Sequence, residues 1–119
     1  WTQVPGMNLN SLDNSDAGIA RIICKNPETC WVAVDNNRIV GTILGGTDGR
    51  KGCIYHTAVD PAQQGKGIGT IDRVCANFKK EKITKIGLFV VIDNDEGKQF
   101  WRKKGWNLRP DIVYLDRDL

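Results

Sequence analysis

The stretch Gln64-Gly65-Lys66-Gly67-Ile68-Gly69-Thr70 decides how this sequence is interpreted, because its glycines stand between a strand-like segment and a helix-like one. Glycines there let backbone N–H groups point inward, and a helix N-terminus adds roughly half a positive charge. Lys66 and the Thr70 hydroxyl supply further groups for an anion. The stretch therefore predicts a phosphate-bearing ligand at a turn from strand to helix.

The spacing of these glycines argues against two common nucleotide loops. A Walker loop needs Gly-Lys-Ser/Thr after four spacer residues, whereas Lys66 is followed by Gly67. A dinucleotide loop has the form G-x-G-x-x-G and turns from its strand almost at once, whereas Gly65 comes six positions after Val59. A dinucleotide-binding module, with Asp93 as its ribose anchor, is therefore the weakest of the hypotheses considered below.

The segments around the loop predict a parallel βαβ unit. Segment 53–59 is strand-like, and apolar residues at 68, 71, 74, 75 and 78 follow helical spacing after the loop. The apolar run 86–92 is typical of a strand that is covered on both faces.

Upstream and downstream segments complete an α/β fold in a single domain, 1–119. Stretch 1–14 is loop-like, a helix is expected over 16–25, and strands at 31–34 and 39–44 form a hairpin before a turn that starts at Gly45-Gly46. A helix capped by Asn94 or Asp95 runs to Lys104, and a weak closing strand contains Ile112, Tyr114 and Leu115. The sheet is mixed and mostly antiparallel, with the parallel βαβ unit at its centre and helices flanking it.

Composition excludes several classes of function. A chain of 119 residues that is 40% hydrophobic and 26% charged fits one soluble domain. The net charge of +3 is too weak and scattered for a nucleic-acid binder, and the longest apolar run is far short of the ~20 residues that cross a membrane. Four cysteines form no C-x-x-C pair, so we expect no metal site, buried thiols and a reducing cytoplasm. Those cysteines are Cys24, Cys30, Cys53 and Cys75.

The segment from Gln64 to Gly69, preceded by Ala58-Val59-Asp60-Pro61, resembles the Q/R-x-x-G-x-G/A signature of the GNAT family of acetyl-CoA-dependent N-acetyltransferases. Asn94 and the segment Phe100-Trp101-Arg102-Lys103-Lys104-Gly105-Trp106 are similar to an Asn and an F-Y-x-K-x-G-F segment of that family. The resemblance covers about 29–119 and lacks the family's first strand. We therefore expect either a truncated N-terminus or a homodimer that covers the open sheet edge.

The resemblance implies where acetyl-CoA, the expected cosubstrate, binds. Its diphosphate would contact Gln64, Gly65, Lys66, Gly67, Ile68, Gly69 and Thr70. Its pantetheine arm would bind like an added strand to backbone at Thr57, Ala58 and Val59, with a further contact from Asn94. Trp101 is counted among the cofactor contacts, at the position of the family's usual general-acid tyrosine.

The reaction so implied is direct attack of a neutral primary amine on the thioester, with a backbone N–H near Val59 stabilising the oxyanion. Trp101 cannot act as the acid, and the position of a common general base falls near Phe89, so the catalytic residues stay unassigned. The substitutes considered are Tyr114, Tyr55 and His56. Strand alternation would send Tyr55 and His56 to opposite faces, so that only one of them reaches the cleft.

The leading hypothesis is therefore an N-acetyltransferase that acts on a primary amine of a small molecule or peptide. The alternative is a non-catalytic domain that binds or senses acyl-CoA. The sequence leaves peptide N-termini, lysines, polyamines and aminoglycosides open as acceptors.

Overall fold

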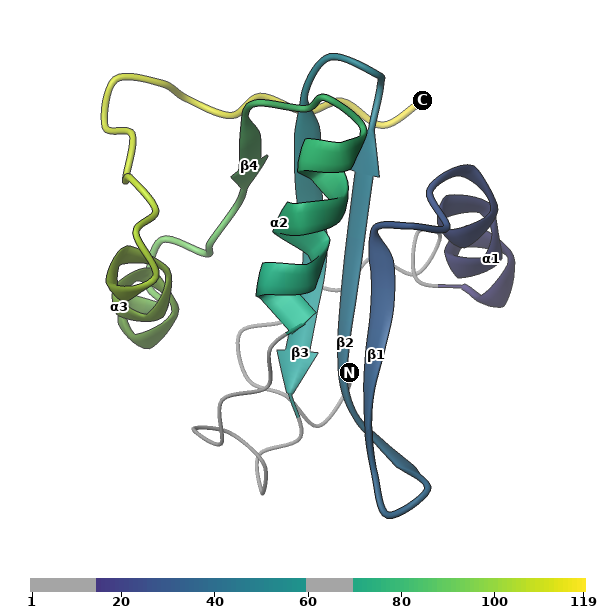
Figure 1. Ribbon diagram of the computed structural model, residues 1–119. Helices are drawn as coiled ribbons and strands as arrows, with labels where there is room; N and C mark the ends of the chain where they lie inside the picture. Colours follow the sequence, from purple (N-terminus) through teal and green to yellow (C-terminus); the bar gives the residue numbers. More distant parts are fainter. Residues whose placement is uncertain (1–14, 60–69) are drawn as a thin grey trace. The chain divides into compact units, whose positions relative to one another are not determined.

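The computed structural model describes residues 15–59 and 70–119 (Figure 1). The chain divides into two compact units, Trp1–Phe89 and Val90–Leu119, and each is described by itself. The first unit contains α1 (Asp16–Lys25), β1 (Cys30–Asp35), β2 (Arg38–Thr47), β3 (Gly52–Val59), α2 (Thr70–Lys80) and β4 (Ile86–Leu88). The second unit contains α3 (Asp95–Lys103). The predicted lack of a first strand concerns stretch 1–14, which lies outside the described residues.

The described strands form one sheet in the order β1-β2-β3-β4. β1, β2 and β3 are antiparallel neighbours, and β4 runs parallel to β3. Asn36 and Asn37 close the β1–β2 hairpin with φ angles of 50° and 63°, a left-handed conformation that asparagine tolerates. This arrangement confirms the predicted mixed α/β fold. β1 is an edge of the described sheet, and the homodimer stays a prediction.

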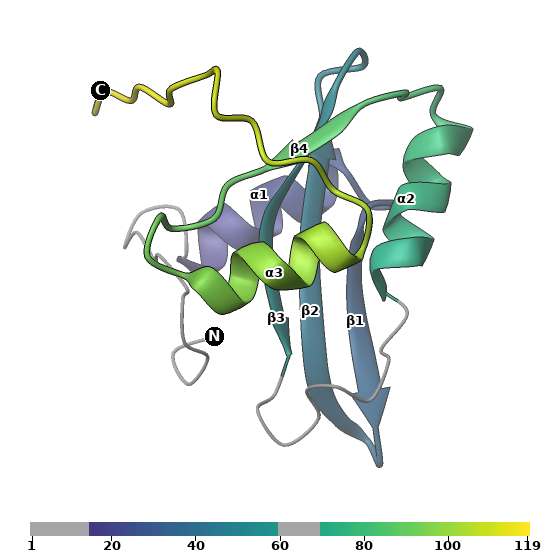
Figure 2. The ribbon, with the colours of Figure 1, turned by 90° about the vertical axis from the view of Figure 1, so that its left-hand side faces the viewer.

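The two helices of the first unit lie on opposite sides of its sheet, as Figures 1 and 2 show together. The core under α2 includes the buried side chains of Ile43, Ile54, Ile71, Val74, Phe78 and Ile83. A Cβ placed at Gly52 would lie 2.6 Å from the Phe78 ring, and one at Gly45 would lie 3.2 Å from it. The start of the second turn predicted at Gly45-Gly46 is wrong, since β2 continues to Thr47 and the turn lies between Thr47 and Gly52. The absent side chain at Gly45 leaves room for the Phe78 ring.

Helix α1 begins and ends as its sequence predicts. The Ser15 hydroxyl caps it by accepting a hydrogen bond from the Gly18 N–H at 3.1 Å. The Asn26 N–H donates to the Ile22 carbonyl at the other end, at 2.9 Å. The Asn26 side-chain oxygen also accepts from the Thr47 N–H at 3.0 Å, which joins the end of α1 to the end of β2.

The apolar run 86–92 is a strand only at Ile86–Leu88. Phe89, Val91 and Ile92 are 68%, 43% and 79% exposed, so the prediction of a long strand covered on both faces is wrong. The β3–β4 ladder pairs Gly52 with Ile86 and ends where Ile54 pairs with Leu88. Apolar residues continue past that point, although the strand ends at Leu88.

In the second unit, α3 confirms the predicted helix, while the closing strand is wrong. Asn94 caps α3 by accepting a hydrogen bond from the Gly97 N–H at 3.0 Å, and Gly105 follows with a φ of 92°. No strand forms at 112–115 in the described part of the chain, where Ile112, Tyr114 and Leu115 are exposed. Apolar alternation makes a strand only where a partner strand completes the hydrogen bonds.

The expectation of buried cysteines is also wrong. Cys24 is exposed, and the other three thiols are only partly covered. No helix in ranges 15–59 and 70–119 has the length and apolar character needed to cross a bilayer.

Candidate functional site

The candidate site is the open edge of β3. Residues 52–54 of this strand pair with β4, whereas in the described structure residues 56–59 pair only with β2. An unpaired strand edge presents backbone donors and acceptors to any extended ligand. Thr57, Ala58 and Val59, the expected contacts of a pantetheine arm, all lie on this open stretch.

A buried hydroxyl without a partner lies on the same stretch. Among the described residues, Thr57 Oγ1 is the one buried side-chain polar atom that forms no hydrogen bond. An unpaired buried hydroxyl costs about 1–3 kcal/mol, so a ligand group bonded to it would recover that free energy. The sequence points only to the backbone of Thr57, because no sequence pattern signals that a buried hydroxyl lacks a partner.

A β-bulge at Tyr55 changes the side-chain pattern of β3. Leu44 pairs with His56 while the next residue, Gly45, pairs with Ile54, so Tyr55 is the extra residue. A Cβ at Gly46 would lie 3.2 Å from the Tyr55 ring, which places that ring on the Gly46 face of the sheet.

His56 lies on this face too, because it pairs with Leu44, and Leu44 shares a face with Gly46. The prediction that Tyr55 and His56 lie on opposite faces is therefore wrong. The bulge inserts one residue and cancels the alternation between them.

The second face of β3 is the one under α2. The Gly45 position faces the Phe78 ring of α2, and Ile43 shares that face by alternation. Thr57 pairs with Ile43, so its hydroxyl lies on the α2 side of the sheet. The unpaired hydroxyl and the Tyr55–His56 pair thus lie on opposite faces of one open strand.

The environment of Tyr55 keeps its phenol protonated. Partial burial, followed by the proximity of Cys53 and Asp48, raises the pKa of Tyr55 above its ordinary value. The ring is still 58% exposed. Tyr55 can therefore give a proton at neutral pH and exchange it with solvent.

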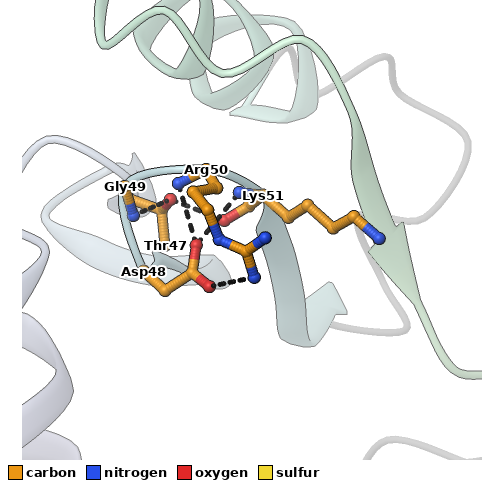
Figure 3. Close-up of polar contacts among 5 residues, drawn as sticks. All are labelled: Thr47, Asp48, Gly49, Arg50 and Lys51. Atoms are coloured by element: carbon orange, nitrogen blue, oxygen red, sulfur yellow. Dashed lines mark hydrogen bonds and ion pairs between the residues drawn. The ribbon is translucent and has the colours of Figure 1, made fainter.

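The β2–β3 turn holds the other end of these strands (Figure 3). Asp48 Oδ1 accepts hydrogen bonds from the N–H groups of Arg50 and Lys51 at 2.8 and 3.0 Å. The Thr47 hydroxyl donates to the Lys51 carbonyl at 2.6 Å and accepts from the Gly49 N–H at 3.0 Å. The backbone bonds from Lys51 and Arg50 lower the pKa of Asp48 to about 2. This turn fixes how β2 and β3 pair, and its Thr47 and Asp48 side chains are already hydrogen-bonded within the turn.

The remaining predicted contacts are placed as follows. Residues 64–69 of the glycine stretch lie outside the described residues, and Thr70 is the first residue of α2. Asn94 caps α3, and Trp101 makes edge-to-face contacts with Phe100 and Trp106 at centroid distances of 5.2 and 5.0 Å. Tyr114 is 63% exposed and belongs to no helix or strand. These second-unit residues keep their cofactor or catalytic roles as predictions.

Within 15–59 and 70–119, no group of three or more His, Cys, Asp or Glu side chains is arranged to hold a metal ion.

The sequence model of the acetyltransferase (GNAT) family matches residues 7–106. The chain belongs to this family. A relative named as an acetyltransferase, from Sodalis glossinidius, is 28% identical over 113 residues, which cover 93% of this chain and 80% of that protein. Family and relative together confirm the prediction of an acyltransferase.

Solved structures of GNAT proteins share the fold. Ard1 from Thermoplasma volcanium is 26% identical with a TM-score of 0.74, over 80% of this chain and 66% of that one. The NatC complex bound to Gag peptide and CoA has a TM-score of 0.71 at 19% identity, over 85% of this chain and 70% of that one. The second likeness shows the fold alone.

Proposed function

We propose that this GNAT chain transfers an acetyl group from acetyl-CoA to a primary amine of a small molecule or peptide by direct attack. The observation that carries the proposal is the open edge of β3, where, among the described residues, the strand edge has no ladder partner and the buried Thr57 hydroxyl has no hydrogen-bond partner. The glycine stretch follows this edge directly in the sequence.

The residues of this chain fit acetyl-CoA. Segment 57–59 offers backbone groups to the two amides of a pantetheine arm, as an edge strand does to an added strand. The Thr57 hydroxyl offers one more donor or acceptor on the α2 side. The glycines at 65, 67 and 69, together with Lys66 and the N-terminus of α2, suit the diphosphate.

Bound acetyl-CoA supplies a thioester, and the protein orients it for attack. A backbone N–H near Val59 would bond to the carbonyl oxygen as negative charge develops there. Two proton transfers accompany the attack, one from the amine and one to the departing sulfur.

A second candidate function is an acyl-CoA-binding domain without turnover. Trp101 favours it, since this residue occupies the position of the family's acid and its ring lies against Phe100 and Trp106. An indole N–H in such a cluster does not protonate a thiolate. Acetylation of any amine by the protein would exclude this candidate.

Calorimetry with acetyl-CoA, coenzyme A and NAD tests the cofactor site. The proposal predicts micromolar binding of the first two ligands, no binding of NAD, and loss of binding in Gly67→Trp. A matched control, Glu81→Trp, places the same side chain at an exposed position past the end of α2 and should bind as the wild type does. Tight binding of NAD with none of acetyl-CoA would contradict the proposal.

A further inference from the structure

The β-bulge brings two titratable side chains together at the point where β3 parts from β4. The last β3–β4 pair is Ile54 with Leu88, and Tyr55 and His56 are the next two residues of β3. Both lie on the face opposite α2, and consecutive Cα atoms are only about 3.8 Å apart. A base and an acid are therefore adjacent at the start of the open edge.

We infer that His56 and Tyr55 are the general base and general acid of the acetyl transfer. This inference rests on the proposed function. It differs from the sequence-based expectation, in which only one of the two could reach the cleft. It also assigns the acid that Trp101 cannot provide.

We expect acetyl-CoA to contact the α2 face of β3 and the acceptor amine to approach its other face. The Thr57 hydroxyl, which has no hydrogen bond among the described residues, lies on the α2 side of the sheet. The acceptor amine would then approach from the other side, where the partly exposed His56 and Tyr55 lie. The thioester carbon at the strand edge would be reached from both sides.

His56 and Tyr55 together account for both protons that move in this step. His56 takes a proton from the attacking nitrogen as the C–N bond forms and the C–S bond breaks. Tyr55 gives its phenolic proton to the sulfur. The imidazolium then returns its proton to the phenolate, directly or through water that reaches the 58% exposed ring. The overall products are an amide and a thiol, and both side chains are restored.

Several titratable groups share the face of this pair. Within the described residues they include Cys53 on β3 and Cys30 on β1, which pairs with Leu44. Asp48 in the turn also acts on Tyr55. Helix α1 contributes Asn26, which does not titrate, while its residues Asp16, Arg21, Cys24 and Lys25 are exposed. The phenol therefore stays protonated. An imidazole is the side chain type whose proton affinity suits a base near neutral pH.

The test is the pH dependence of acetyl transfer in the full chain, with a lysine peptide, a peptide with a free N-terminus and spermidine as acceptors. Wild-type kcat/KM should fall below the ordinary imidazole pKa, about 6.5. In His56→Gln, this decline of kcat/KM at low pH should disappear, and kcat should fall by about 10²-fold or more. In Tyr55→Phe, kcat should fall by about 10²-fold. Both should bind acetyl-CoA with unchanged affinity.

Glu81→Gln, at an exposed position past the end of α2, is the control and should leave the rate and the pH profile unchanged. The inference is overturned if Tyr114→Phe lowers kcat while Tyr55→Phe does not, or if His56→Gln keeps the decline of kcat/KM at low pH. His56 is the sole histidine of the chain, so its Hε1 proton gives a single imidazole signal by NMR. Addition of an acceptor to the complex with coenzyme A should shift the pH midpoint of that signal, and an unmoved midpoint would contradict the inference.

Failure of the proposed function would give different results from failure of the His56–Tyr55 assignment alone. Wild-type protein that binds acetyl-CoA and acetylates none of the amines would overturn both statements. Active wild-type protein with active, normally titrating variants would overturn only the His56–Tyr55 pair.

Discussion

Thr29 and Gly45 are joined by two hydrogen bonds of opposite direction. The Gly45 N–H donates to the Thr29 carbonyl, and the Thr29 hydroxyl donates to the Gly45 carbonyl, each at 2.9 Å. Thr29 is fully buried. The pairing of β2 with β3 shifts between Leu44 and Gly45, so these bonds hold β2 at the point where the bulge places Tyr55 and His56 on one face.

Replacing Thr29 by valine tests that link. Valine keeps the shape but removes the donor, which leaves the buried Gly45 carbonyl without this hydroxyl. We expect a loss of about 1–2 kcal/mol in the free energy of unfolding, measured in urea. Thr29→Ser keeps the hydroxyl and serves as the control for the bond itself. Equal stability of Thr29→Val and wild type would contradict the role of this bond.

Substitution of Gly52 tests the packing under α2. An added Cβ would meet Phe78 at 2.6 Å and Ile86 at 2.7 Å, and both side chains would have to move. Gly52→Ala should lower the free energy of unfolding by about 1–3 kcal/mol. Gly87→Ala on the neighbouring strand meets no atom within 4 Å, so it should change stability by no more than about 0.5 kcal/mol. Equal effects of the two changes would refute this packing.

The acid sensitivity of the β2–β3 turn depends on Asp48. Its pKa is about 2 in the folded chain against an ordinary 3.8, so the carboxylate stabilises the fold above pH 3.8. That contribution is lost as the pH falls through about 2. Asp48→Asn keeps an oxygen that accepts hydrogen bonds but does not titrate. Its urea unfolding should therefore depend less on pH than that of the wild type between these two values, and an unchanged dependence would contradict the assignment.

Thr57→Val separates folding from cofactor binding. Removing an unpaired buried hydroxyl should raise the free energy of unfolding by about 1 kcal/mol in the absence of ligand. If the hydroxyl bonds to acetyl-CoA, the same change should weaken binding about tenfold by calorimetry. Thr57→Ser, which retains the hydroxyl, should bind normally. A variant that is more stable and binds as tightly would exclude Thr57 from the cofactor site.

Local signals predict much of this fold. The serine cap and the apolar spacing predict α1 to the residue, and Asn36 and Asn37 mark the β1–β2 hairpin. These features depend on neighbours in the sequence. The glycine motif likewise indicates the family without any knowledge of the packing.

What the sequence did not reveal depends on contacts between distant segments. The bulge at Tyr55 follows from how β2 is held by Thr29 and Phe78, and strand alternation gives no sign of it. The end of β4 at Leu88 depends on where its ladder with β3 stops, although the apolar run continues. The key feature of the candidate site, two side chains on one face, therefore became visible only in the structure.

The most direct test of the central claim is the release of coenzyme A thiol from acetyl-CoA in the presence of a primary amine, with the amine product identified by mass spectrometry. The account predicts amine-dependent release, with acetylated amine and free thiol formed in equal amounts and both lost in Gly67→Trp. Binding of acetyl-CoA with no acetylated product from a lysine peptide, a free peptide N-terminus, a polyamine or an aminoglycoside would contradict it and favour a binding domain without turnover.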